Sequence, residues 1–264
     1  MSQFDFSVIN VSTNEIPENE RIPLLRDFYC RGVLKAEVEA REGKPAAASF
    51  TSHVLPEAQL LIGGLCGARV IRTKHLVADG DDSLALIVNR SGVLGISERG
   101  HDLSLRAGEA VLTSAEDVTT FERLSLGSSF SLRVPRRVLA PMIVDVDDAV
   151  MRVMPESSTG LRLLVDYAVT LVREKAFAMP NLRQLGVGHL HDLLAIVLGA
   201  TNEPRELAGR RALYAPTHRV LPLVLRDLGP HSRAPWGVYS DRPIHPPGGC
   251  AAPHPAVGTI PCRT

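Results

Sequence analysis

LALIVNRSGVLGISERGHDLSLRAGEAVLT, residues 84–113, is the most informative part of this 264-residue sequence. Four short apolar runs alternate here with three polar separators that contain glycine, at 90–92, 98–101 and 106–109. Apolar runs of this length between strong turn formers are typical of β-strands, whereas a helix would need a longer periodic pattern. The separators therefore predict tight turns between successive strands, with Gly108 in a hairpin turn of the barrel.

The same pattern extends to both sides and predicts a mainly β protein. The expected strands cover residues 60–65, 68–71, 84–89, 93–97, 102–105, 110–113, 120–124 and 129–133. Short strands at such spacing are typical of an antiparallel jelly roll or cupin-like barrel. Apolar residues at helical intervals predict one short helix before the strands, over 18–29.

A helical region follows the strands. Pro135 ends the last strand, and residues 136–143 are expected to form a short helix. Two longer amphipathic patterns, separated by a break at 179–181, predict an antiparallel helical hairpin, with Ser157 or Ser158 as the first N-cap. The second helix is too apolar to stand alone and needs the barrel or another chain as a partner. We assign four of its residues to homodimerisation: Leu190, Leu193, Leu194 and Val197.

The last segment changes in composition. Ten of the 19 prolines fall within residues 216–264, and no helical or strand period persists there. Such a segment buries too little apolar surface to offset its chain entropy, so we expect a disordered tail. The sequence thus divides into a predicted barrel with its helix (1–135), a helical hairpin that we assign to dimerisation (136–208) and the tail (209–264).

Composition limits the classes of function. Lys+Arg and Asp+Glu are equal at 29 each, so the chain has no overall basic field for nucleic acid. Four scattered cysteines do not form a metal knuckle or a disulfide framework. The sequence shows no signal peptide and no apolar run of membrane-spanning length, so we expect a cytoplasmic protein that does not contact the membrane.

Residues with chemical potential do not form a recognisable site. His53, His75 and His101 are isolated near predicted turns, which speaks against the paired histidines of a metal-binding cupin. His189 and His191 are two apart on a helix and point away from each other. We therefore predict no catalytic residue, no metal and no cofactor, and assign no ligand-binding residue. The alternative is a cupin-type small-molecule-binding protein or enzyme.

Several stretches together resemble the N-terminal AraC-binding-like domain of AraC/XylS transcription regulators. They are STNEIPENER at 12–21, LVADGDDSLAL at 76–86, LRAGEAVL at 105–112, SLRVPRRVLAP at 131–141, residues 161–171 and HLHDLL at 189–194. The resemblance covers residues 6–207. It implies a sensory domain that binds a small-molecule effector and dimerises, either with itself or with full-length relatives that it would remove from DNA.

The resemblance also implies a DNA-reading part. Members of this family continue into two helix-turn-helix units that need roughly a hundred residues. The segment after residue 208 shows none of that pattern. We expect it to be the product of a truncated or frameshifted gene rather than a genuine proline-rich tail, and we expect the chain to bind DNA without sequence specificity.

Overall fold

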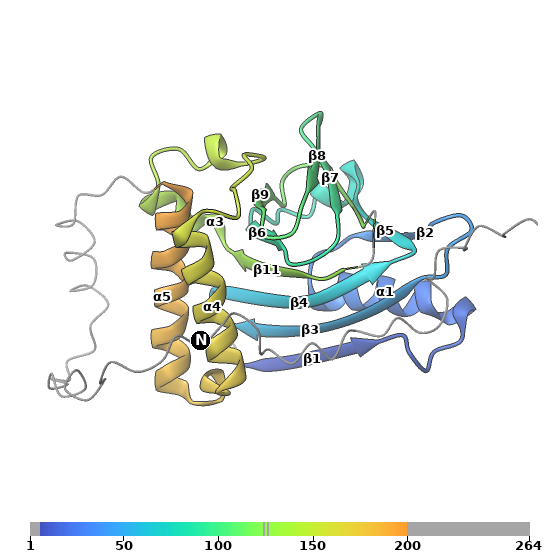
Figure 1. Cartoon of the computed structure of the whole chain (residues 1–264), viewed down its shortest axis with the longest axis horizontal. Helices are drawn as coiled ribbons and strands as arrows, with labels where there is room; N and C mark the ends of the chain where they lie inside the picture. The colour runs from blue at the N-terminus through green and yellow to red at the C-terminus, as the bar shows by residue number, and fades with distance from the viewer. Residues whose placement is uncertain (1–5, 124, 126, 200–264) are drawn as a thin grey trace, which may run out of the picture. The chain divides into compact units, whose positions relative to one another are not determined.

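The computed structural model of the chain describes residues 6–123, 125 and 127–199 (Figure 1). Within this range the strands are β1 Ser7–Ser12, β2 Glu37–Ala40, β3 Ala47–Leu55, β4 Ala58–Cys66, β5 Ala68–Arg72, β6 Leu84–Asn89, β7 Leu94–Glu98, β8 His101–Leu105, β9 Ala110–Ser114, β10 Thr119–Arg123 and β11 Ser129–Val134. The helices are α1 Glu18–Gly32, α2 Lys74–Val77, α3 Arg136–Leu139, α4 Thr159–Arg173 and α5 Pro180–Leu198. The tail expected at 209–264 lies outside the described residues.

The strands form two antiparallel sheets. One has six strands in the order β1-β3-β4-β11-β6-β9, and the other has five in the order β2-β5-β10-β7-β8. All eight predicted strands are present, and their ends agree with the prediction to within two residues. The prediction did not include strands β1, β2 and β3 or the short helix α2. Strands β1 and β3 mix polar and apolar residues without a clean alternation, so their sequences lack the usual strand pattern.

Tight turns between the strands follow from the glycine positions. Arg99 and Gly100 connect β7 to β8 and both have positive φ, at 52° and 76°, as a two-residue type I′ hairpin requires. Gly108 also has a positive φ of 84°, which confirms the turn predicted there. That turn is not a hairpin, however, because β8 belongs to the five-stranded sheet and β9 to the six-stranded one.

Strand β11 shows how the six-stranded sheet uses its two faces. Phe130, Leu132 and Val134 are fully buried in the main core, together with residues of α4 and α5. The alternate residues Ser129, Ser131 and Arg133 line a cavity on the opposite face. Because successive side chains of a strand point to opposite faces, one strand contacts the helical hairpin and the cavity at once.

Helices α4 and α5 form the predicted antiparallel hairpin and lie side by side (Figure 1). The hydroxyl of Ser158 caps α4 by accepting a hydrogen bond from the Leu161 N–H at 3.3 Å. Pro180 occupies the first turn of α5, where its missing N–H costs nothing. At Gly186, an added Cβ would lie 2.9 Å from the Leu171 side chain of α4. A small residue at this crossing therefore lets the two helices approach closely.

Candidate functional site

A cavity of about 120 Å³ lies between the two sheets. Its walls come from β4, β6 and β11 on one side and from β5 and β10 on the other. Tyr29 of α1 and Leu34, just after that helix, also line it. A concave space with a few polar groups among apolar walls is the usual form of a small-molecule site.

The middle of the cavity is apolar. Phe121 of β10 pairs with Val70 of β5, and both side chains line the cavity. On the opposite sheet Ser131 pairs with Leu61 and Ile87, which line it too. The hydroxyl of Ser131 is the one polar side-chain group among these five, so this layer favours the hydrocarbon part of a ligand.

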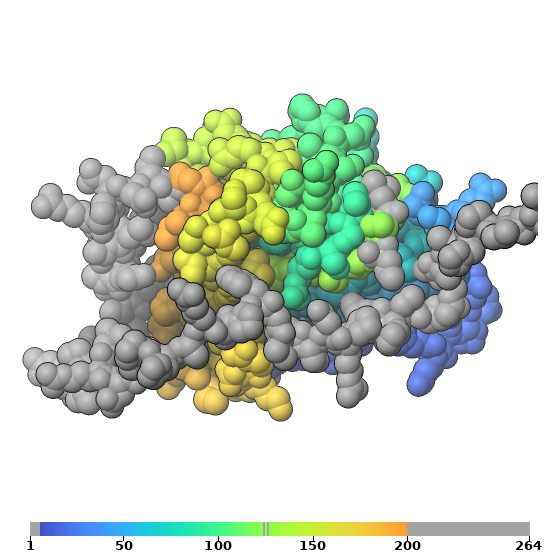
Figure 2. Space-filling model, in the orientation of Figure 1, coloured from blue at the N-terminus to red at the C-terminus, as the bar shows by residue number. Residues whose placement is uncertain are grey.

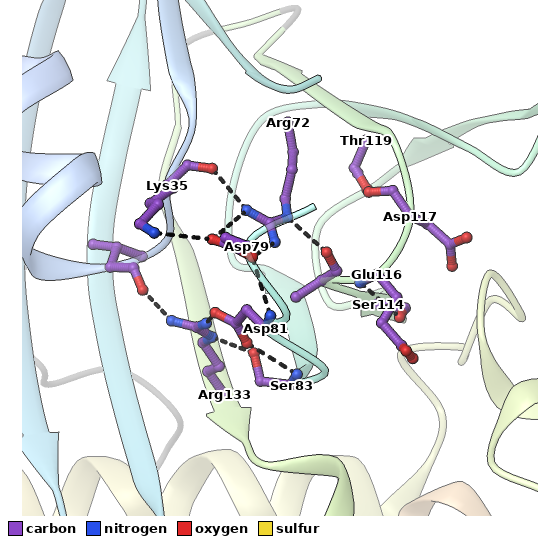
Figure 3. Close-up of polar contacts among 12 residues, drawn as sticks. Lys35, Arg72, Asp79, Asp81, Ser83, Ser114, Glu116, Asp117, Thr119 and Arg133 are labelled. Atoms are coloured by element: carbon purple, nitrogen blue, oxygen red, sulfur yellow. Dashed lines mark hydrogen bonds and ion pairs between the residues drawn. The ribbon is translucent and has the colours of Figure 1, made fainter. Parts of the chain in front are cut away.

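One end of the cavity is polar, and its charges are matched (Figure 3). Arg72 is fully buried and donates to the Asp79 carboxylate, with 2.8 Å between Nη2 and Oδ1. The ammonium of Lys35 lies 3.6 Å from the same carboxylate. The hydrogen bond from Arg72 lowers the pKa of Asp79 to about 2, so this carboxylate is charged at neutral pH. Arg133 forms an ion pair with Asp81.

These arginines also join segments that are far apart in the sequence. Besides Asp81, Arg133 donates to the Ser83 hydroxyl at 2.6 Å and to the carbonyl of Val33 at the end of α1. Arg72 donates from Nε to the Ala115 carbonyl at 2.6 Å. The polar end is therefore a bonded network whose donors already have acceptors.

The third arginine of the cavity, Arg123, has different surroundings. Its side chain is only 6% exposed, and Nη1 donates to Asn89 Oδ1 at 3.1 Å and to the Ser91 carbonyl at 2.8 Å. Asn89 is itself fixed, because its Nδ2 donates to the carbonyls of Gly92 and Leu105. Burial lowers the pKa of Arg123 below its ordinary value. Within residues 6–123, 125 and 127–199, no carboxylate forms an ion pair with it.

A buried carboxyl lies behind the wall of the cavity. Glu98 is 2% exposed and accepts hydrogen bonds from the Ser114 N–H and the Thr119 hydroxyl, each at 3.0 Å. Ser114 and Thr119 both line the cavity. Burial raises the pKa of Glu98 to about 7, and the two hydrogen bonds only partly oppose that increase.

No ligand-binding residue was predicted from the sequence, so the three cavity arginines were missed. A usable signal existed, because Arg123 follows Thr119 and Phe121 at alternate positions, and Arg133 follows Ser129 and Ser131 in the same way. An arginine in phase with the inward face of a strand is a candidate for contact with the interior.

The four residues assigned to dimerisation do not share one environment. Leu190 and Leu194 are 0% exposed and belong to the core between α5 and the six-stranded sheet. Leu193 and Val197 are partly buried and pack against that core. Two of the four side chains are therefore already buried within the described part of the chain. Dimerisation itself stays a prediction.

The histidines also differ from expectation in part. His53, expected near a turn and exposed, is buried on β3, with its ring 6.4 Å from Phe6 and 6.2 Å from Phe177. His189 and His191 make separate contacts, His189 with the Tyr167 hydroxyl at 2.7 Å and His191 with the Glu57 carbonyl at 3.0 Å. In the described ranges, no three or more His, Cys, Asp or Glu side chains are grouped to hold a metal ion.

Comparisons with known proteins bear on the fold. No family model matches the sequence, and no curated protein matches it either. Among solved structures, the AraC-like transcriptional activator CuxR is similar with a TM-score of 0.61 at 15% identity, over 74% of this chain and 71% of that one. KdgF from Halomonas sp. (16% identity, 38% of this chain and 87% of that one) and an RmlC-like cupin from Shewanella frigidimarina (11%, 39% and 86%) each reach a TM-score of 0.28.

The class of the protein follows from the sheets and the likeness to CuxR. The chain has a mainly antiparallel, cupin-like β fold followed by an antiparallel helical hairpin, as the sequence predicted. Over 74% of this chain the fold is similar to that of CuxR. None of the described helices is both long and apolar enough to cross a membrane.

Proposed function

We propose that this chain is the effector-sensing and dimerisation part of an AraC-type transcription regulator. In this proposal a small molecule enters the cavity between the sheets. It binds one arrangement of the sheets and hairpin more tightly than another, and the population shifts toward that arrangement. A helix-turn-helix segment distinct from the described residues would then read DNA.

The proposal rests on one observation. The six-stranded sheet lines the cavity with one face and packs against the helical hairpin with the other. On β11, Ser131 faces the cavity while its neighbours Phe130 and Leu132 lie in the core shared with α4 and α5. A ligand that displaces this strand therefore acts directly on the packing of the hairpin. The likeness to CuxR over 74% of the chain supports the same conclusion from the fold.

The test is a metabolite screen by thermal shift on the purified chain, followed by a variant that fills the cavity. Ser131→Leu adds apolar volume inside the cavity and should abolish the shift caused by any compound found. Thr120→Leu makes the same kind of change at a residue that does not line the cavity. It is the matched control and should retain the thermal shift caused by the compound. The proposal fails if Ser131→Leu and Thr120→Leu bind every compound equally well.

For assembly, we propose a homodimer formed through the outward face of α5. Leu182, Leu185 and Ile196 are exposed, Leu185 to 55%, and their spacing places them within one narrow stripe of the helix. Leu193 and Val197 flank that stripe. Atoms of α4 and parts of α5 are visible at the molecular surface beside the strands (Figure 2). A symmetric pairing of this stripe with a second copy would bury the exposed leucines.

Charge substitution tests the dimer without disturbing the core. Leu185→Glu should convert a dimer to a monomer in light scattering coupled to size exclusion, because the glutamate would be buried in the interface. Gln184→Glu, exposed on another side of α5, is the control and should leave the mass unchanged. A wild-type protein that is monomeric at micromolar concentration would contradict the proposed assembly.

A further inference from the structure

The three arginines of the cavity differ in charge balance. Arg72 and Arg133 each have an aspartate partner, Asp79 and Asp81 respectively. Arg123 is buried, as Arg72 is, but the described residues offer it only neutral acceptors, the amide of Asn89 and a backbone carbonyl. A buried cation without an anion is costly, and the cost is recovered when a ligand supplies the missing charge.

The guanidinium of Arg123 is held in a position to receive such a ligand. A guanidinium has five N–H donors in a planar fork. In the described part of the chain, both of its hydrogen bonds are made by Nη1, so the edge formed by Nε and Nη2 is available for a two-point contact. Asn89, held by its own two hydrogen bonds, keeps Nη1 in place. Parallel N–H···O bonds to a carboxylate are the strongest use of that fork.

Tyr29 supplies a second donor at the same cavity. Its ring packs edge-on against Phe50 at 6.1 Å, and its phenol interacts electrostatically with Arg123. Burial raises the pKa of this phenol, so the group keeps its proton and can donate a hydrogen bond to an anion. Ser129 also lines the cavity and pairs with Asn89 on the adjacent strand.

The remaining space limits the rest of the ligand. An apolar cavity of about 150 Å³ accommodates a benzene molecule, and this one has a volume of about 120 Å³. Phe121, Val70, Leu61 and Ile87 surround the space and offer no hydrogen bonds from their side chains. A polyhydroxylated molecule would lose its water contacts there without replacement, whereas the space and its walls favour an apolar body no larger than about a single ring.

We propose that the effector is a small organic monocarboxylate whose carboxylate binds Arg123 and whose apolar body lies against Phe121. This inference rests on the proposed effector role and adds the chemical class of the ligand. The carboxylate supplies the anion that the described residues do not provide to Arg123. Tyr29 donates a further hydrogen bond to the same group.

The experiment compares charged and neutral probes of equal shape. Isothermal titration with benzoate and hexanoate is set against benzamide and 1-hexanol, using the full chain at low salt. The carboxylates should bind at least tenfold more tightly than their neutral counterparts. Arg123→Gln should remove this preference, and Tyr29→Phe should weaken carboxylate binding several-fold. Arg69→Gln, a half-exposed arginine of β5 paired with Glu39, is the control and should change neither.

The outcomes separate this inference from the function on which it rests. If benzamide and 1-hexanol bind as well as the acids, and Arg123→Gln changes nothing, the assignment of a carboxylate is wrong while an effector cavity remains. If none of the four probes binds, the assignment is equally wrong, and an empty metabolite screen then counts against the effector role as well. Should Arg123→Gln fail to fold, Tyr29→Phe gives the decision, since it removes only the hydroxyl.

Discussion

Replacing Glu98 with glutamine should reduce the loss of folding stability as the pH rises from 5 to 8. The carboxyl is buried behind Ser114 and Thr119, and burial raises its pKa from 4.5 to about 7. A folded-state pKa above the unfolded value means that the folded protein prefers the neutral acid. The stability contributed by that acid is complete below pH 4.5 and is lost as the pH rises toward 7. Glutamine has no proton to lose at this position.

The size of the effect follows from the two pKa values. Their difference of about 2.5 (about 7 minus 4.5) corresponds to a ceiling of about 3.4 kcal/mol. Part of that loss has already occurred at pH 5, where an unfolded glutamate is mostly ionised. Between pH 5 and pH 8, the stability of Glu98→Gln relative to the wild type should therefore increase by about 2.5 kcal/mol.

Urea unfolding followed by circular dichroism at pH 5, 6, 7 and 8 measures this difference. The constant cost of the substitution cancels, because only the change of the difference with pH is used. Glu37→Gln, exposed on β2, shows what the loss of a surface carboxylate does under the same conditions. If wild type and Glu98→Gln keep the same difference at all four pH values, the argument from burial is wrong.

Three further outcomes are expected in the same unfolding assay. Burial lowers the pKa of His53, so the stability contributed by the neutral imidazole is complete above pH 6.5 and is lost as the pH falls. His53→Leu should therefore lose less stability than the wild type between pH 7 and pH 5. Equal losses of stability in the two proteins would contradict this. Ser158→Ala should cost about 1 kcal/mol through the lost N-cap, with the exposed Ser157→Ala as a neutral control. Gly63→Ala should cost more than about 1 kcal/mol, because its Cβ would lie 2.0 Å from a backbone oxygen. Gly188→Ala, in open space on α5, should not destabilise the protein. Similar values for the two variants would refute the steric argument.

The strands were predictable wherever the signal is local. Turns such as Arg99-Gly100 require positive φ, and glycine meets that requirement, so the sequence between 84 and 113 shows its strand ends directly. Strands β1 and β3 lack such a signal. Strand β1 pairs with β3 along its whole length, Ser7 with Val54 through Ser12 with Ser49, and this long-range pairing, not composition, makes them strands.

The candidate site was less predictable, because it depends on which face of each strand points inward. Both faces of β11 are occupied, one by the cavity and one by the main core, so its alternation of residues does not show which is which. The same ambiguity affected α5. Its excess of apolar residues correctly indicated a partner, but only the packed structure separates Leu190, in the core, from Leu185, on the surface.

The two ends of the cavity differ in their charge balance. At one end, Arg133 ties β11 to Asp81 and to the end of α1, so that end is closed by the chain itself. At the other end, Arg123 has its fixed neighbour Asn89 but no anion among the described residues. A ligand carboxylate would complete the second end as Asp81 completes the first, and Ser129 and Ser131 of β11 lie between them. Because Phe130 and Leu132 of the same strand pack in the core with α4 and α5, a change in how β11 is held reaches the hairpin through a single layer of side chains.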